Sequence, residues 1–265
     1  MEHATHKHPY HIITPSPWPI MAAFSAGAML FGGLLYMHHQ VLWLSLVGLG
    51  FLLLTSWLWW RDVIKEGIHD KAHTEEVSHG LRMGMLLFIV SEVMFFAAFF
   101  WAFFDASLFP KEAIEFTWPP KTIKTLDPFE LPFLNTLILL LSGCTVTWAH
   151  YSIREGNKDD TVKGIGLTVV LGIIFLFVQA YEYSHASFKF ADGIYASTFY
   201  MATGFHGFHV LIGTIFLAVC YFRAAKGQFT SEKHIGFEAA SWYWHFVDVV
   251  WLFLFVSIYW WGGAH

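Results

Sequence analysis

Residues 87–104 read LFIVSEVMFFAAFFWAFF, an almost continuous run of aliphatic and aromatic side chains with one carboxylic acid, Glu92, near its middle. About 20 apolar residues are enough for a helix to cross the hydrocarbon core of a bilayer. Because lipid offers no hydrogen bonds, spanning chains form helices or closed barrels. The run lacks the alternation of polar and apolar residues found in barrel strands, so we expect a transmembrane helix around Glu92.

The whole chain shares the character of this run. Its 265 residues are 56% hydrophobic and 19% aromatic, and only 13% are charged. Soluble domains carry about 25% charged residues, so about half of the usual charge is missing. Long apolar runs that alternate with short charged patches indicate a polytopic membrane protein.

Seven segments are long and apolar enough to span a membrane. We predict an all-α membrane protein with a single domain over residues 1–265 and with helices at roughly 18–37, 41–60, 80–108, 131–154, 162–186, 191–223 and 237–261. The third and sixth segments are longer than a bilayer requires, so we expect them to tilt or protrude. A charged, histidine-rich loop at 61–80 divides the chain into two helices and then five.

The positions of lysine and arginine predict the orientation. With the N-terminus inside, four of the 15 basic residues fall outside, at Lys111, Lys121, Lys124 and Lys189, and the other 11 fall inside. Basic residues accumulate in inner loops, so we predict an inner N-terminus and an outer C-terminus. The first 20 residues resemble neither a secretory signal nor a transit peptide. We therefore expect synthesis at the site of insertion, in a bacterium or inside an organelle.

A carboxyl group deep in a span is expected to have a partner or a function. Glu92 lies about 18 Å along its helix at 1.5 Å per residue, which places it near the bilayer midplane. Burial favours the neutral acid, which can hydrogen-bond to a neighbouring helix. A proton relay or an ion site is the functional alternative, and the sequence leaves both open.

The last predicted helix carries polar residues on one face. In GFEAASWYWHFVDVVWLF, residues 236–253, the residues Glu238, Trp242, His245 and Asp248 follow one another at helical spacing. His245 and Asp248 are close enough to bond each other. We expect this face to point into the bundle, because lipid would not accept it. A packing network and a proton conduit both fit the pattern.

Two further helices carry paired polar residues. In ATGFHGFHVLIGT, residues 202–214, His206 and His209 share a face and could hold a metal or haem, with His150 or His245 as further ligands. Since only this histidine pair is dense, we expect packing instead of a metal site. Glu182 lies near the outer end of the fifth helix, and we expect it to be partly hydrated. The predicted buried polar network comprises Glu92, His206, His209, Glu238, His245 and Asp248.

Nine motifs lie within the stretch that runs from Tyr10 nearly to the C-terminus: PSPWP, WWRDV, LFIVSEVMFF, FWAFF, WPP, LNTLILLLSG, VTWAH, ATGFHGFHV and GFEAASWYWHFVDVVWLFLFVSIYWW. Together they closely resemble subunit III of the aa3-type cytochrome c oxidases. The compact loops and the ending SIYWWGG are more similar to mitochondrial members of that family than to bacterial ones.

This resemblance implies two groups of helices, I–II and III–VII, separated by a V-shaped cleft that is filled with phospholipid. Carried over by motif, the lipid contacts would fall on Trp60, Lys65, Glu66, His73 and Arg223. Lys65 stands where close mitochondrial relatives have arginine. A bidentate contact with a phosphate would there become a contact with a point charge.

The resemblance also implies a function as a core subunit of complex IV, which reduces oxygen with electrons from cytochrome c and pumps protons. Haem a, haem a3 and the copper centres would belong to partner subunits I and II, and no metal or other cofactor except bound phospholipid is expected on this chain. The subunit would pack against subunit I, hold lipids and steady the active site. It would lie in the mitochondrial inner membrane or a bacterial plasma membrane, with accessory subunits or a supercomplex as further partners.

Acidic residues and histidines on the inner surface could also feed protons to the uptake path of a neighbouring subunit, since histidine titrates near neutral pH. These residues are His3, His6, His8, His11, Glu75 and Glu76. The alternative function is a proton-coupled transporter with Glu92, His245 and Asp248 as its relay. Many transporters contain inverted repeats and broken helices, and neither is visible in this sequence.

Overall fold

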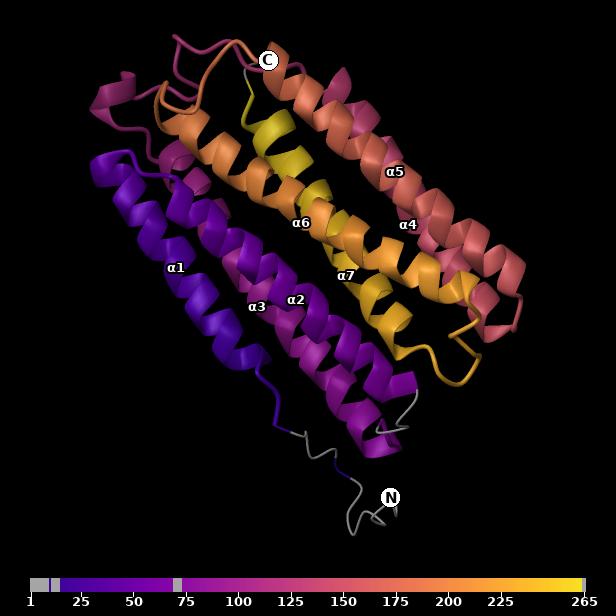
Figure 1. The fold of residues 1–265 in the computed structure, drawn as a ribbon. Helices are drawn as coiled ribbons and strands as arrows, with labels where there is room; N and C mark the ends of the chain where they lie inside the picture. Colours follow the sequence, from indigo (N-terminus) through magenta and orange to yellow (C-terminus); the bar gives the residue numbers. More distant parts are fainter. Residues whose placement is uncertain (1–9, 11–14, 69–72, 264–265) are drawn as a thin grey trace, which may run out of the picture. The chain divides into compact units, whose positions relative to one another are not determined.

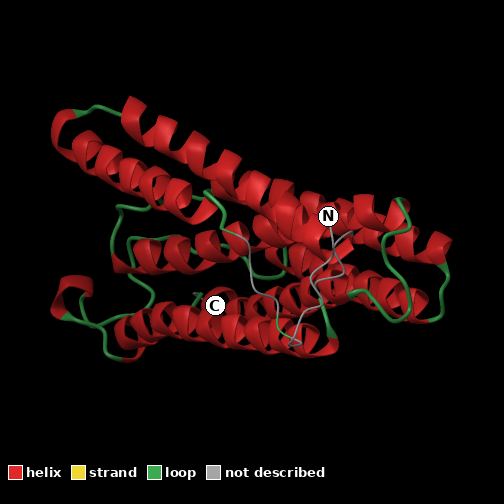
Figure 2. Cartoon of the chain, turned by 60° about the horizontal axis from the view of Figure 1, so that its bottom comes forward, coloured by secondary structure: helices red, strands yellow, loops and turns green. Residues whose placement is uncertain are grey.

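The computed structural model describes residues 10, 15–68 and 73–263, and most of them are helical (Figure 2). Within these residues, seven helices are long and apolar enough to span a membrane. They are α1 Trp18–His39, α2 Trp43–Ile68, α3 Glu75–Leu108, α4 Leu131–Arg154, α5 Lys158–His185, α6 Ile194–Ala225 and α7 Ile235–Leu254. A 3₁₀ turn, η1 Glu112–Ile114, follows α3, and a π-helical segment, η2 Phe255–Trp261, continues α7. The predicted all-α membrane class is confirmed.

The second and third helices are longer than the sequence predicted. Helix α2 continues past residue 60 to Ile68, and α3 begins at Glu75, so most of the predicted loop at 61–80 is helical. The extension of α2 has a tertiary partner, because the indole N–H of Trp18 donates to Oδ2 of Asp62 at 2.9 Å. Arginine, lysine and glutamate on this extension also favour a helix.

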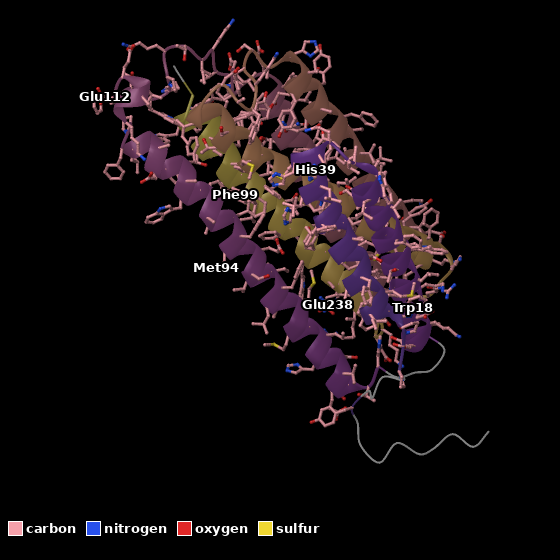
Figure 3. All side chains as sticks on the ribbon, turned by 60° about the vertical axis from the view of Figure 1, so that its left-hand side comes forward. Trp18, His39, Met94, Phe99, Glu112 and Glu238 are labelled. Carbon is pink, nitrogen blue, oxygen red and sulfur yellow. The ribbon has the colours of Figure 1, made fainter. Side chains whose placement is uncertain are left out.

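The chain forms two compact units, Met1–Leu81 and Arg82–His265. In the first unit α1 and α2 lie side by side (Figure 1), and Trp18 and His39 mark the two ends of α1 (Figure 3). A Cβ atom on Gly32 would overlap the backbone of Ser45, and one on Gly48 would overlap the backbone of Met29. These glycines therefore allow the two backbones to touch, as small residues do between membrane helices. A single domain over residues 1–265 stays a prediction.

Helix α7 is the centre of the second unit. In the apolar 18-residue stretch of the span Ile235–Trp261, 67% of the residues are buried, whereas the matching stretch of no other described span exceeds 39%. The fully buried indole of Trp244 fills a notch, since a Cβ atom on Gly172 or Gly213 would lie within 3 Å of its ring. Its N–H donates to Oγ of Ser142 at 2.9 Å. One side chain of α7 thus touches α4, α5 and α6, which run alongside it in Figure 1.

Helix α3 contacts the rest of this unit mainly through aromatic side chains. Its backbone approaches the backbones of α4, α5, α6 and α7 closely at few points. The ring centroids of Phe95 and Phe99 lie 5.1 and 5.0 Å from that of Phe205 on α6. Phe100 packs edge-to-face on Phe253 of α7 at 4.4 Å. The rings of Phe95, Phe99 and Phe100 thus lie between α3 and its neighbours, in the edge-to-face and stacked arrangements that aromatic pairs prefer.

The notch around Trp244 generates a stability prediction. In Gly213→Val the new Cβ would lie 2.9 Å from Cε3 of Trp244, and overpacking of this kind costs about 1–3 kcal/mol. We expect a lower thermal unfolding midpoint for the intact complex in detergent. Gly207→Val on the same helix is the control, because a Cβ there has no neighbour within 4 Å. Equal midpoints for the two variants would contradict the packing role.

Candidate functional site

Glu92 on α3 is hydrogen-bonded to His209 on α6, with 2.8 Å between Oε2 and Nε2. Nδ1 of His209 lies 2.7 Å from the backbone oxygen of Phe205. A carbonyl oxygen only accepts, so Nδ1 carries hydrogen and donates to it. The contact between Nε2 and Oε2 then needs one proton, on the acid or on the ring, because otherwise two lone pairs would face each other. In either form the pair has no net charge, which avoids the cost of an isolated buried charge.

Aromatic rings surround this pair. The centroid of the His209 ring lies 4.9 Å from that of Phe96 and 5.9 Å from that of Phe95. Tyr243 and Phe246 of α7 follow at 6.3 and 6.4 Å. Only 9% of the His209 side chain is exposed. The pair is therefore a polar contact enclosed in an aromatic layer, and it joins α3 to α6.

His206 does not share a partner with His209. Its Nε2 lies 3.1 Å from the backbone oxygen of Val247 on α7, and its ring packs against Phe175 and Trp251. One histidine thus binds α7 and the other binds α3. Among residues 10, 15–68 and 73–263, no group of three or more His, Cys, Asp or Glu side chains could hold a metal ion.

The polar residues of α7 make two separate contacts. Oε2 of Glu238 lies 2.9 Å from Nε of Arg82 on α3. Nε2 of His245 lies 3.2 Å from Oγ1 of Thr147 on α4, and its Nδ1 lies 3.6 Å from Oδ2 of Asp248. The prediction that this face points into the bundle is only partly right, because 44% of the His245 side chain is exposed, against 9% for Asp248.

The predicted buried polar residues therefore do not form one network. Glu92 bonds to α6, His206 bonds to the backbone of α7, and Asp248 lies in the seam between α4 and α7. The carboxylate of Asp248 packs directly against Gly143 of α4. A Cβ atom on Gly143 would lie 2.5 Å from Oδ2 of Asp248, so only glycine leaves enough space for this carboxylate. Within the described residues, no hydrogen bond or ion pair joins Glu92 to His245 or Asp248, the three residues of the transporter alternative.

A buried polar cluster around Glu182 was not predicted from the sequence. Glu182 was expected to be partly hydrated, but it is only 2% exposed. Its Oε1 accepts hydrogen bonds from Tyr259 Oη at 2.7 Å and Gln179 Nε2 at 3.0 Å, and Nδ2 of Asn135 donates to Gln179 at 3.4 Å. The sequence contains one indication of this cluster: Gln179 and Glu182 are three residues apart, which puts both on one helix face. Their partners on α4 and η2 cannot be read from that spacing.

Four of the predicted lipid contacts lie in the first unit. Trp60 is 66% exposed near the end of α2. Lys65 is exposed and Glu66 is half-buried, one turn further along the same helix. The imidazole of His73 lies against Gly67, where a Cβ atom would be 2.8 Å from the ring. The structure thus brings His73 to the end of α2, although the chain between residues 68 and 73 is outside the described part.

The remaining predicted residues lie elsewhere. Arg223, in the second unit, packs its guanidinium 4.5 Å from the centre of the Phe229 ring, and its Nε donates to Gln228 at 3.3 Å. Glu75 and Glu76 are exposed in the first turn of α3. The histidines of the predicted inner surface lie outside the described residues: His3, His6, His8 and His11.

Comparisons with known proteins agree with the motifs. The family model for cytochrome c oxidase subunit III matches residues 8–263. The chain is 58% identical to cytochrome c oxidase subunit 3 of Chondrus crispus over 260 residues, which cover 97% of this chain and 96% of the relative. It is 56% identical to the Dugong dugon protein of the same name over 263 residues, which cover 99% and 100%.

The chain belongs to the cytochrome c oxidase subunit III family. It is a core subunit of complex IV and a multi-pass protein of a mitochondrial or bacterial respiratory membrane. The polar pairs described above are therefore features of a subunit that works inside a larger complex.

The pairing of Glu92 with His209 predicts different outcomes for two substitutions. In Glu92→Gln the side-chain amide can still donate to Nε2 of His209, so we expect the stability of the complex to change little. Glu92→Leu leaves Nε2 without a partner, which costs about 1–3 kcal/mol for a buried group. The measurement is the thermal unfolding midpoint of the complex for both variants. Equal losses would instead indicate a charged pair that needs the carboxylate.

Proposed function

We propose that this chain, a complex IV subunit without a redox centre, holds phospholipids beside subunit I and steadies the active site during turnover. The main support is that polar side chains of the helices are matched to one another, as in Arg82–Glu238 at the end of α7 and Glu92–His209 within the span. Groups bonded in this way are occupied in packing the helices. On this proposal haem a, haem a3 and copper belong to subunits I and II.

The lipid-binding part of the proposal rests on the end of α2. Lys65 offers a positive charge beyond the apolar part of the helix, and the exposed indole of Trp60 lies where aromatic residues meet headgroups. Glu66 and His73 add polar groups at the same end. Arg223 contributes a guanidinium at the end of α6. We propose that the lipids occupy the V-shaped cleft between helices I–II and III–VII that the family resemblance implies.

We also propose an orientation and a minor second role. Basic residues favour a matrix or cytoplasmic N-terminus. On that side the exposed carboxylates of Glu75 and Glu76, with the histidines near the N-terminus, could collect protons for the uptake path of a neighbouring subunit. Clusters of surface charge raise the local concentration of oppositely charged ions in this way.

The charge at residue 65 predicts the amount of lipid retained. Lys65→Arg restores a bidentate donor and should increase the phospholipid phosphorus that stays with the detergent-washed complex, whereas Lys65→Gln should reduce it. The activity of Lys65→Gln should also decay faster during turnover. Haem and copper contents should stay unchanged in both variants.

The control for residue 65 is Lys163→Gln. Lys163 is an exposed lysine of α5 whose side chain is paired with Asp160 at 3.4 Å. A metal or haem lost together with either lysine would contradict the proposal that this subunit has no redox centre. Equal lipid contents in all three variants would contradict the lipid site.

The proposed proton-collecting role predicts a kinetic effect. Glu75→Gln combined with Glu76→Gln should slow proton uptake by the reconstituted complex, most visibly at high pH, where protons are scarce. The matched control is Glu112→Gln with Glu115→Gln, which changes two exposed acids in the loop after α3. Uptake that is equally fast in both double variants would exclude this role for Glu75 and Glu76.

A further inference from the structure

A groove runs along the seam between α4 and α7, within the second unit. It encloses about 300 Å³ and is lined by Thr147, His150, Tyr151, Arg154, Ser241, Trp242 and His245. The α4 residues follow one another at helical spacing and end at Arg154, the last residue of that helix. His245 lies about 15 Å along α7 from its start, at 1.5 Å per residue. The groove therefore leads from the end of the bundle into the membrane span.

The polar groups in the deep part of the groove already have partners. His245 is bonded to Thr147 on one side of its ring and faces Asp248 on the other. Ser241 is buried. A polar ligand would therefore find no free hydrogen-bonding partner on these side chains. The rings of Trp242 and His245 form a mainly apolar surface in this part of the groove.

The mouth of the groove is different. Arg154 makes no ion pair, and His150 makes no hydrogen bond, with any residue in the described part of the chain. His234 lies close to His150, with 5.6 Å between the ring centroids. The carboxylate of Glu238 is nearby, but its charge is compensated by Arg82 at 2.9 Å. Glu155, next to Arg154 in the chain, is exposed. The carboxylate of Glu155 interacts with the hydroxyl of Tyr151. The mouth thus presents the guanidinium of Arg154 and the imidazole of His150, neither of which forms an ion pair with a carboxylate in the described part of the chain.

We propose that this groove binds one anionic phospholipid, with its phosphate at Arg154 and His150 and an acyl chain against Trp242. Three observations favour a lipid over a soluble anion. The charge lies at the end of a membrane span, where headgroups are found. Tyr151 and Trp242 are amphipathic residues of the kind that border headgroups. The groove continues from this charge toward the middle of the span, where an acyl chain fits and a small anion gains nothing.

This site is separate from the lipid residues proposed above. Those residues lie at the ends of α2 and α6, and none of them lines the groove between α4 and α7. Basic pockets between membrane helices commonly bind the headgroups of anionic lipids. The charge of this groove and its place at the end of the helices fit that rule. The proposal also does not depend on the role of Lys65.

The test is photo-labelling of the intact complex in vesicles. One set of vesicles contains phosphatidylglycerol with a diazirine on an acyl chain, and a second set contains the same diazirine on phosphatidylcholine. After illumination, labelled peptides are mapped by mass spectrometry. We expect phosphatidylglycerol to label the peptides that contain residues 147–154 and 241–245 more strongly than phosphatidylcholine does, and we expect excess inorganic phosphate not to compete.

Arg154→Gln should reduce the phosphatidylglycerol label on these peptides about fivefold, which corresponds to about 1 kcal/mol for one basic residue near an anionic membrane. Lys163→Gln, which removes a basic residue from the first turns of α5, should leave the label unchanged. Should Arg154→Gln fail to assemble, His150→Gln provides the second variant, with a smaller reduction expected.

Four results would overturn the proposal. The first is equal labelling by the two lipids, and the second is labelling that neither variant alters. The third is displacement of the label by inorganic phosphate, which would indicate a site for free anions. The fourth is the absence of any label on these peptides in the unmodified complex, which would show that protein covers the groove.

Discussion

The structure depends on one constraint: inside a bilayer, a polar group that finds no partner in the protein finds none in the lipid. Apolar contact alone does not drive membrane helices together, because lipid tails are as apolar as leucine. Close packing and hydrogen bonds must supply specificity. In this chain both are concentrated on α7, whose Trp244 fits between two glycines and bonds to Ser142, while Trp251 donates to Thr136 at 2.9 Å.

The two units solve the packing problem differently. In the first, Gly32 and Gly48 bring the backbones of α1 and α2 into contact, with few buried polar groups. In the second, aromatic rings separate the backbone of α3 from those of its neighbours. The contacts of Arg82 with Glu238 and of Glu92 with His209 fix the position of α3 along α7 and α6. A subunit without a redox centre can use ionisable groups in this way, as matched pairs that hold helices in place.

Sequence reasoning succeeded where a signal is local. Apolar runs gave the number of spans, and the helical spacing of His245 and Asp248 predicted their contact. It failed where the partner comes from a distant helix. Nothing in the local sequence of Glu182 indicates that Tyr259 of a π-helical segment would reach it, and the end of α2 was missed because Asp62 is held by Trp18. Partners of buried polar residues depend on tertiary geometry, which spacing along one helix does not contain.

The central place of α7 has a consequence for biogenesis. It is the last of the seven helices to leave the ribosome, yet Glu238, Trp244 and Trp251 on it bond to groups on α3 and α4. Until it is inserted, Arg82, Ser142 and Thr136 lack these partners. The hydroxyls of Ser142 and Thr136 keep their hydrogen bonds to carbonyl groups of α4, whereas Arg82 has no carboxylate partner until Glu238 arrives. Insertion of α7 then supplies the partners that α3 and α4 lack.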